Sequence, residues 1–365
     1  MWGPHAEALY EIGGAEDLIM NAVAPPAKVA ILYASSTDIW QLSSIDGNYA
    51  YGFDRMHTWM ALAHAQIPVD FLSEAQVERG ALASYRVCYL HGPNLTRAAA
   101  AKLDAWVNAG GTLVATAGAG ARDEYNRTFA TIESLLPATR GTLSTLQRFV
   151  NSGSYLNILN IKDTVTAGAA KINVLSVRQP LTAKSGTTTR GKFNDNTPAW
   201  VYGTKGSGKV HCLGFLPALD YIREALVLRK DLAGKPLDSV SGEDRWRLEQ
   251  SANPWAYPAA VREAILAPVR EAAIDPPVIC SVPQVDAVYM RASGDVVIPL
   301  ANYTLYPLDT VHFSVRVDRT VAYVETIYQG RIPFQQKGNR VSFSVPLAST
   351  DYVKIYYKRG LMLIL

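Results

Sequence analysis

From residue 28 onward, short apolar runs alternate with segments of helical composition. The apolar runs have the length of buried strands and span 28–34, 67–73, 85–92 and 112–118, whereas 53–66 and 96–111 read as helices. Strands that alternate with helices pair in parallel through right-handed crossovers. We therefore expect an α/β domain built on a flavodoxin-like, doubly wound parallel sheet with the strand order 2-1-3-4.

The alternation stops after the fourth of these strands. Residues 127–200 lack it, and 199–217 reads as a hairpin that closes the domain. A helical region punctuated by prolines comes next, and then short alternating strands recur with turn signals at "SGD", "YQG" and "KGN", which predicts an antiparallel β-sandwich. The predicted parts are an N-terminal helical arm (1–27), the α/β domain (28–225), a helical linker region (226–276) and the β-sandwich domain (277–365).

Composition and charge narrow the class of protein. Of the 365 residues, 48% are hydrophobic and 18% are charged, which is typical of packed globular domains. The net charge of +3 comes from scattered basic residues rather than from a basic patch with interleaved aromatics, so we expect no nucleic-acid partner. Cys88, Cys212 and Cys280 fit neither a disulfide framework nor a metal-ligand spacing, which favours a reducing compartment.

Signals for targeting, metals and cofactors are missing from the sequence. The N-terminal stretch does not read as a signal peptide, and no run of about 18 apolar residues occurs, so we expect a cytoplasmic protein without a membrane partner. The stretch "GTKGSGK" (203–209) is close to a phosphate-binding loop, but Val210 stands where Ser or Thr is needed, which favours a hairpin turn. We predict neither a metal site nor a cofactor.

Several runs resemble a known family. The stretches "VAILYASSTDIW", "YRVCYLHGPNLT" and "LDAWVNAGGTLVATAGAGARDEYN" resemble the trimerisation domain of family 42 β-galactosidases, whose fold is like that of class I glutamine amidotransferases. The stretches "GKVHCLGFLP" and "VVIPLANYT" resemble the end of that domain and the β-sandwich that succeeds it in those proteins. The resemblance covers roughly residues 25–360 and implies self-association, with a trimer as the expected oligomer.

The same resemblance supplies no catalytic residue. In family 42 β-galactosidases the catalytic carboxylates lie on a (β/α)8 barrel, and of these 365 residues only 1–24 could correspond to a part of it, its last helix. The amidotransferase nucleophile is a cysteine after the fourth strand, where this chain has Thr116, Ala117 and Gly118. Any activity must therefore come from residues that belong to this chain alone.

Candidate residues for such chemistry gather at one edge of the predicted sheet. In a doubly wound sheet, ligands bind at the carboxyl ends of the strands, where the strand order reverses. The loops and the first helix expected at that edge carry Ser35, Ser36, Thr37, Asp38, Trp40, Asp54, His57, His91, Gly92, Asn94, Thr116, Arg122, Asp123, Glu124, Tyr125 and Asn126. Together they contain the parts of an acyl-transfer site.

A serine hydrolase is the first functional hypothesis. A serine nucleophile needs an imidazole to take its proton, an acid to orient the imidazole, and donors for the oxyanion. "YASST" stands where flavodoxin-like SGNH esterases have their nucleophile loop, and "GPN" is similar to their Gly-x-Asn oxyanion block. The assigned roles are Ser36 or Ser35 as nucleophile, His57 or His91 as base, Asp54, Asp123 or Glu124 as acid, Gly92 and Asn94 as oxyanion donors, and Asp38, Trp40, Thr116, Arg122, Tyr125 and Asn126 as substrate-binding residues.

The substrate of this hydrolase would be a small carboxylic ester. A glycoside is the second option, because Asp38, Asp54, Asp123 and Glu124 could supply two carboxylates at about 5–9.5 Å. Each element also has a structural interpretation: the serines cap a helix, "GPN" forms a turn, and the histidines and aromatics pack.

The alternative hypothesis is a non-catalytic module for oligomerisation and carbohydrate binding. It draws on the family resemblance, whereas the number of ionisable residues at one edge favours the hydrolase.

Overall fold

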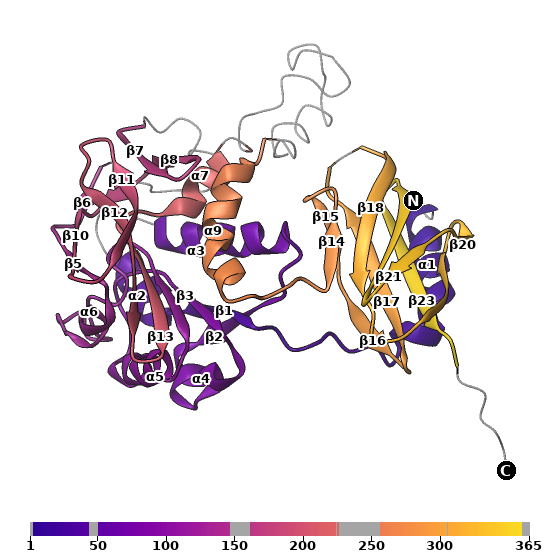
Figure 1. Ribbon diagram of the computed structural model, residues 1–365, viewed down its shortest axis with the longest axis horizontal. Coiled ribbons are helices and arrows are strands. Elements are labelled where there is room, and N and C mark those ends of the chain that lie inside the picture. Colours follow the sequence, from indigo (N-terminus) through magenta and orange to yellow (C-terminus); the bar gives the residue numbers. More distant parts are fainter. Residues whose placement is uncertain are drawn as a thin grey trace. The chain divides into compact units, whose positions relative to one another are not determined.

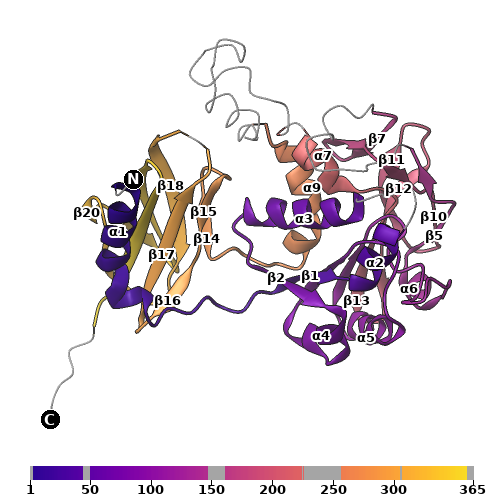
Figure 2. The ribbon, with the colours of Figure 1, turned by 180° about the vertical axis from the view of Figure 1, so that it is seen from behind.

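The computed structural model describes residues 3–43, 50–146, 161–223, 225, 256–304 and 306–359. They form two compact units: an α/β unit of residues 27–62 and 69–274, and a sandwich unit of residues 1–26, 63–68 and 275–365. Figure 1 and Figure 2 show the elements of each unit from two sides. Among the described residues, none of the helices combines the length and apolar character needed to span a membrane.

Five parallel strands form one half of the main sheet of the α/β unit. They are β1 (Val29–Tyr33), β2 (Val69–Ser73), β3 (Val87–Leu90), β4 (Thr112–Ala115) and β13 (Gly208–Leu213), in the order β2-β1-β3-β4-β13. The apolar runs that become β1, β3 and β4 have almost all of their side chains buried on both faces of the sheet, whereas β2, at the edge, exposes Asp70 and Phe71. The predicted order 2-1-3-4 is confirmed.

The other half of this sheet is antiparallel, so the predicted parallel sheet is one part of a larger mixed sheet. Four strands continue from β13: β12 (Pro198–Lys205), β11 (Thr188–Phe193), β7 (Asp163–Ala167) and β8 (Ala170–Val174). Three of them come from the region without helical alternation, where hairpin connections replace crossover helices. The predicted hairpin at 199–217 is confirmed, since β12 and β13 pair across the turn at Gly206.

Two small sheets flank this antiparallel half. They are β5 (Ala138–Arg140) with β10 (Leu181–Ala183), and β6 (Ser144–Thr145) with β9 (Val177–Arg178).

Helices cover both faces of the sheet. One face packs on α4 (Glu74–Glu78), η1 (Ala81–Ser84), α5 (Arg97–Asn108) and α6 (Thr131–Leu135), through a core that includes Leu32, Leu90, Leu103 and Ile132. The other face carries α3 (Ala50–Ala63), α7 (Pro217–Arg223) and α9 (Ala259–Glu271). Helix α2 (Ser35–Ser43) comes directly after β1 at the carboxyl edge of the sheet. Of the predicted helical linker, 226–255 lie outside the described residues.

The sandwich unit confirms the predicted antiparallel β-sandwich. The strands of one sheet lie in the order β14 (Val278–Cys280), β18 (Leu308–Arg316), β22 (Arg340–Leu347) and β21 (Gln335–Lys337). The strands of the other sheet lie in the order β15 (Val285–Ala287), β17 (Asp295–Asn302), β23 (Thr350–Tyr357), β19 (Val321–Thr326) and β20 (Gly330–Ile332). In this second sheet, β16 (Met290–Ala292) also pairs with β17. Their inner faces share one core, in which the rings of Phe313 and Phe343 stack.

The N-terminal helix α1 (Gly3–Ile19) belongs to the sandwich unit and lies along β17 and β23 (Figure 1). Glu11 accepts hydrogen bonds from the hydroxyls of Tyr328 (2.6 Å) and Thr350 (2.8 Å), and Lys354 donates to the carbonyl of Gly14 (3.0 Å). The helix thus buries one side against a sheet that comes almost 300 residues later in the chain.

Candidate functional site

The two serines that come after β1 begin helix α2, and a buried carboxylate binds both of them. Glu74 Oε2 accepts hydrogen bonds from Ser35 Oγ (2.8 Å), Ser36 Oγ (3.0 Å) and the backbone N–H of Ser36 (3.0 Å). Its other oxygen accepts the backbone N–H of Thr96, the N-terminal cap of α5, at 2.9 Å. Glu74 is 4% exposed. One carboxylate therefore joins the first turns of two helices, where backbone N–H groups need acceptors.

Glu74 reaches the serines because β1 and β2 are parallel neighbours that end at the same edge. Tyr33 lies opposite Ser73 in their register, so α2 and α4 begin side by side. Sequence analysis considered the loops after the first, third and fourth strands and left out the loop after the second. The order 2-1-3-4 was the available signal, since it puts the second strand beside the first.

Neither predicted histidine is hydrogen-bonded to these serines in the part of the chain that the structure describes. Both hydroxyls donate to Glu74 instead. A serine nucleophile needs an imidazole within about 2.6–3.2 Å of its hydroxyl. The interpretation of the serines as the start of a helix accounts for these contacts.

His91 is paired with Asp54. His91 Nδ1 lies 2.8 Å from Asp54 Oδ2, and both side chains are fully buried. The second oxygen of Asp54 accepts the backbone N–H of Ala218 at 2.8 Å, in the first turn of α7. Nε2 of His91 has no hydrogen-bond partner among the described residues. Asp54 thus orients the imidazole of His91, as the acid of a catalytic triad does. Its two contacts also connect α3 with the end of β3 and with α7.

His57 lies one turn after Asp54 on α3 and is buried too. Its Nδ1 atom has no hydrogen-bond partner among the residues the structure describes. Burial lowers the pKa of His57 to about 4 because a charged imidazolium would lose its hydration there. The ring therefore stays neutral near pH 7, beside the ring of Phe53 at a centroid distance of 5.7 Å.

The hydrogen-bond donors of Asn94, in the "GPN" turn after β3, are bonded to neighbouring residues of the protein. Asn94 Nδ2 donates to the carbonyl of Asp123 (3.0 Å) and to Asn126 Oδ1 (3.1 Å), and its backbone N–H donates to Thr37 Oγ1 (2.9 Å). Gly92 has a φ of +85°, and a Cβ atom there would lie 2.2 Å from Cγ2 of Thr37. Both predicted oxyanion positions thus serve the packing of this turn against α2 and the loop after β4.

Asp123 organises the loop after β4. Its carboxylate accepts the backbone N–H groups of Tyr125 (3.0 Å) and Arg127 (2.7 Å) and two hydrogen bonds from the Arg97 guanidinium (2.9 and 2.7 Å). Burial raises the pKa of Asp123, but these hydrogen bonds outweigh burial and hold the pKa below its ordinary value. Glu124 accepts the backbone N–H of Arg97 at 3.0 Å.

The remaining predicted residues also have defined places. Their contacts are Asp38 with Arg55 (2.8 Å), Trp40 Nε1 with the Glu124 carbonyl (2.9 Å), Thr116 Oγ1 with the Leu90 carbonyl (3.4 Å) and Arg122 Nη1 with the Asn126 carbonyl (2.9 Å). Tyr125 is 65% exposed. Each carboxylate considered for glycoside cleavage is therefore bonded within the protein. In the described segments, no group of three or more His, Cys, Asp and Glu side chains is placed to hold a metal ion.

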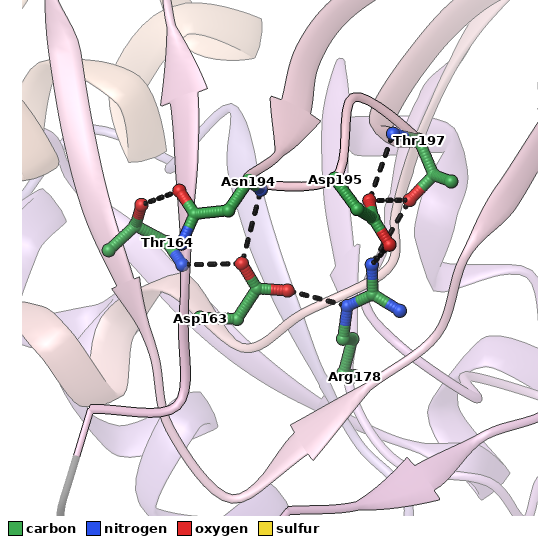
Figure 3. Close-up of polar contacts among 6 residues, drawn as sticks. All are labelled: Asp163, Thr164, Arg178, Asn194, Asp195 and Thr197. Carbon is green, nitrogen blue, oxygen red and sulfur yellow. Dashed lines mark hydrogen bonds and ion pairs between the residues drawn. The ribbon is translucent and has the colours of Figure 1, made fainter.

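A second polar cluster, which sequence analysis did not single out, lies in the antiparallel half of the sheet (Figure 3). Arg178 bridges two carboxylates, with Nε 2.6 Å from Asp163 Oδ2 and Nη2 2.5 Å from Asp195 Oδ2. The turn after β11 closes on the same group, because Asn194 N–H donates to Asp163 (3.1 Å) and the Thr197 hydroxyl donates to Asp195 (2.6 Å). The cluster fastens β7, β9 and this turn together.

The comparisons with known proteins agree with this fold. The sequence model of the β-galactosidase trimerisation domain matches residues 27–231. Similar solved structures include the β-galactosidase from Bacillus circulans sp. alkalophilus (14% identity, TM-score 0.65, covering 96% of this chain and 44% of that one). The polyextremophilic β-galactosidase from Halorubrum lacusprofundi has 14% identity and a TM-score of 0.59, covering 96% and 42%. α-L-Fucosidase isoenzyme 2 from Paenibacillus thiaminolyticus has 16% identity and a TM-score of 0.61, covering 97% and 52%.

At these identities the likeness shows the fold, and this chain spans about half or less of the length of these proteins. Among curated protein sequences no relative matches. The family match covers more than half of the 365 residues. The resemblance seen in the sequence is thus confirmed, and the chain belongs to the β-galactosidase trimerisation domain family.

Proposed function

We propose that this chain is a self-association module that assembles into a trimer and has no catalytic centre of its own. The family of residues 27–231, which is named for trimerisation, supports the first part. One observation supports the absence of a catalytic centre: the hydroxyls of Ser35 and Ser36 both donate hydrogen bonds to Glu74. Of the two hypotheses drawn from the sequence, this is the one that the geometry supports better.

The hydrolase hypothesis has less support because its parts are engaged elsewhere. Asp54 and His91 form the pair that is most like a catalytic acid and base. Among the described residues, however, no serine is hydrogen-bonded to Nε2 of His91. The oxyanion donors of Asn94 are bonded to neighbouring loops. The carboxylates of Asp38 and Asp123 are each bound by an arginine, so neither is available to a substrate.

Two measurements on the full chain test the proposal. Light scattering coupled to size-exclusion chromatography at micromolar concentration should give three times the mass of one chain. Hydrolysis assays with p-nitrophenyl acetate, p-nitrophenyl butyrate and p-nitrophenyl β-galactoside should show no turnover above buffer.

The outcomes separate the two parts of the proposal. A monomer at every concentration would contradict self-association. Ester turnover that is lost in Ser36→Ala or Ser35→Ala, and kept in the exposed control Ser84→Ala, would restore the serine hydrolase. Galactoside turnover that none of the three variants changes would point to the carboxylates.

A further inference from the structure

Large apolar side chains are exposed together at the β2 end of the α/β unit. Five of them form a surface that we call the edge patch: Tyr33 on β1, Ile39 on α2, Met56 and Trp59 on α3, and Phe71 on β2. Their exposed fractions run from 40% for Trp59 to 65% for Ile39. Single exposed apolar residues are normal on a soluble protein, whereas a contiguous group marks an interaction surface.

Strand register, one ring contact and helix spacing connect Phe71, Tyr33 and Trp59 of the patch. Tyr33 lies opposite Ser73 in the β1–β2 register, so Phe71, two residues earlier, lies diagonally beside Tyr33 on the same face of the sheet. The guanidinium of Arg55 lies 4.3 Å from the centre of the Tyr33 ring. On α3, Trp59 comes one turn after Arg55. The path from β2 through β1 to α3 is therefore unbroken.

An ion pair inside the patch leaves it without net charge. The Arg55 guanidinium binds both oxygens of Asp38, at 3.2 and 2.8 Å, and Asp38 is the neighbour of Ile39 on α2. Arg55 is mostly buried, with 9% of its side chain exposed. Aromatic residues, methionine and arginine are the residue types enriched at the centres of protein interfaces. The edge patch has that composition.

The strand under the patch is open on one side. β2 is the terminal strand of the main sheet and pairs only with β1 in the described part of the chain. Edge strands of soluble monomers carry charges, prolines or bulges that prevent pairing with other chains. On β2 the exposed carboxylate of Asp70 lies on the opposite face, where the Tyr85 hydroxyl donates to it at 2.7 Å, and the face that Tyr33 shares carries Phe71. An apolar side chain at an open edge favours a partner that covers it.

We infer that the edge patch is part of the interface between copies of this chain. The inference rests on the proposed self-association and adds to it the surface that the copies use. A second copy is the occupant because the patch lies within residues 27–231, the part that matches a family named for trimerisation. A cyclic trimer joins two different surfaces of its subunits, so the edge patch packs against another face of the neighbouring chain.

Charge substitutions on two separate elements test the surface. Trp59→Glu and Phe71→Glu should each raise the concentration at which the oligomer dissociates by about tenfold or more, because a carboxylate would be buried at the interface. The matched control is Tyr303→Glu, at a tyrosine of the sandwich unit that is 64% exposed, and it should associate like the wild type. Light scattering across a dilution series gives the oligomer, and circular dichroism melting confirms that each variant is folded.

A measurement on the wild type keeps the test independent of folding defects. Hydrogen peroxide should oxidise Met56, which is 44% exposed in the single chain, slowly in the oligomer and faster after dilution. Met20, 73% exposed on the sandwich unit, is the internal control and should react at the same rate in both. Peptide mass spectrometry reads out both residues in one sample.

Each outcome has one meaning. A wild-type trimer that both patch variants leave intact, with Met56 oxidised at one rate throughout, overturns the edge patch and leaves the proposed function standing. A wild-type monomer at all concentrations overturns both. Weakened association in both patch variants, together with protection of Met56, supports the surface.

Discussion

Ser36 and Glu74 are joined twice, since Oε2 of Glu74 accepts both the hydroxyl and the backbone N–H of Ser36 at 3.0 Å. The serine that sequence analysis chose as nucleophile is therefore a donor to a buried anion. Its alkoxide would face a carboxylate at hydrogen-bond distance, which opposes ionisation of the hydroxyl. The same contact gives the start of α2 an acceptor, so the serine is explained by the folding of this edge.

The first prediction concerns this carboxylate. Glu74→Ala should destabilise the α/β unit by about 2–4 kcal/mol, because it leaves the buried donors of Ser36 and the partly buried N–H of Thr96 without an acceptor. Ser36→Ala removes one hydroxyl and should cost about 1 kcal/mol. Urea unfolding followed by circular dichroism measures both. Glu263→Ala, at a side chain that is 55% exposed, is the control and should change stability little. Equal effects of Glu74→Ala and the control would show that the carboxylate has no structural role.

The second prediction concerns Asp54 and His91. Asp54→Ala and His91→Ala should each destabilise the protein by roughly 3 kcal/mol, because each leaves a buried partner alone. The double variant should cost less than the two single costs together, by about 1–3 kcal/mol, since the pair is lost only once. Unfolding free energies of the four proteins give this coupling. Additive costs would mean that the contact at 2.8 Å contributes nothing to stability.

The positions of strands were predictable because burial on both faces produces apolar runs. The predicted strand 112–118 contains β4 at Thr112–Ala115, and the first turn of α2 begins where Ser35 and Ser36 interrupt the run. Helix ends were harder. The predicted helix 53–66 is α3 at Ala50–Ala63, and its end is set by Gln66, which has a φ of +57° and whose side-chain amide bonds the backbone of Val285 and Ala287. That contact spans more than 200 residues, which local pattern cannot show.

For the candidate site, the sequence predicted which loops lie close together but not which side chains bind one another. Strand order brings the loops of Asn94 and Asp123 together, and the structure has them in hydrogen-bond contact. Which partner each side chain binds depends on tenths of an ångström and on competitors in loops that were not considered. Glu74 binds the serines, and Arg97 binds Asp123. Residue type and spacing indicate which functional groups lie at the edge of the sheet. The packing of the loops decides which of these groups are hydrogen-bonded to each other.

The third prediction is a pH dependence from His57. Its pKa is about 4 in the folded protein because of burial, below the ordinary value of 6.5. Between these values the unfolded chain binds a proton that the folded chain does not, so stability falls as the pH falls from 6.5 toward 4. His57 alone should remove about 2 kcal/mol from about pH 7 to about pH 5.

The variant His57→Leu isolates this contribution. Its unfolding free energy should fall less over that pH interval than that of the wild type, by about 2 kcal/mol. His5→Leu, at an exposed histidine of α1, should keep the wild-type slope. Urea unfolding at both pH values checks this, and parallel curves for the wild type and His57→Leu would refute the neutral buried histidine.

The fourth prediction separates backbone strain from steric contact at two glycines. Gly92 and Gly80 have similar φ angles, +85° and +91°, so alanine at either position meets the same left-handed penalty of roughly 1–2 kcal/mol. Their surroundings differ: a Cβ atom at Gly92 would lie 2.2 Å from Cγ2 of Thr37, whereas nothing lies within 4 Å at Gly80. Gly80→Ala should therefore cost the backbone penalty alone. Gly92→Ala should cost at least about 1–3 kcal/mol more, because the turn after β3 must move away from α2. Thermal unfolding of the two variants measures the difference, and equal costs would mean that this turn and α2 are not in the tight contact that holds Asn94 against Thr37.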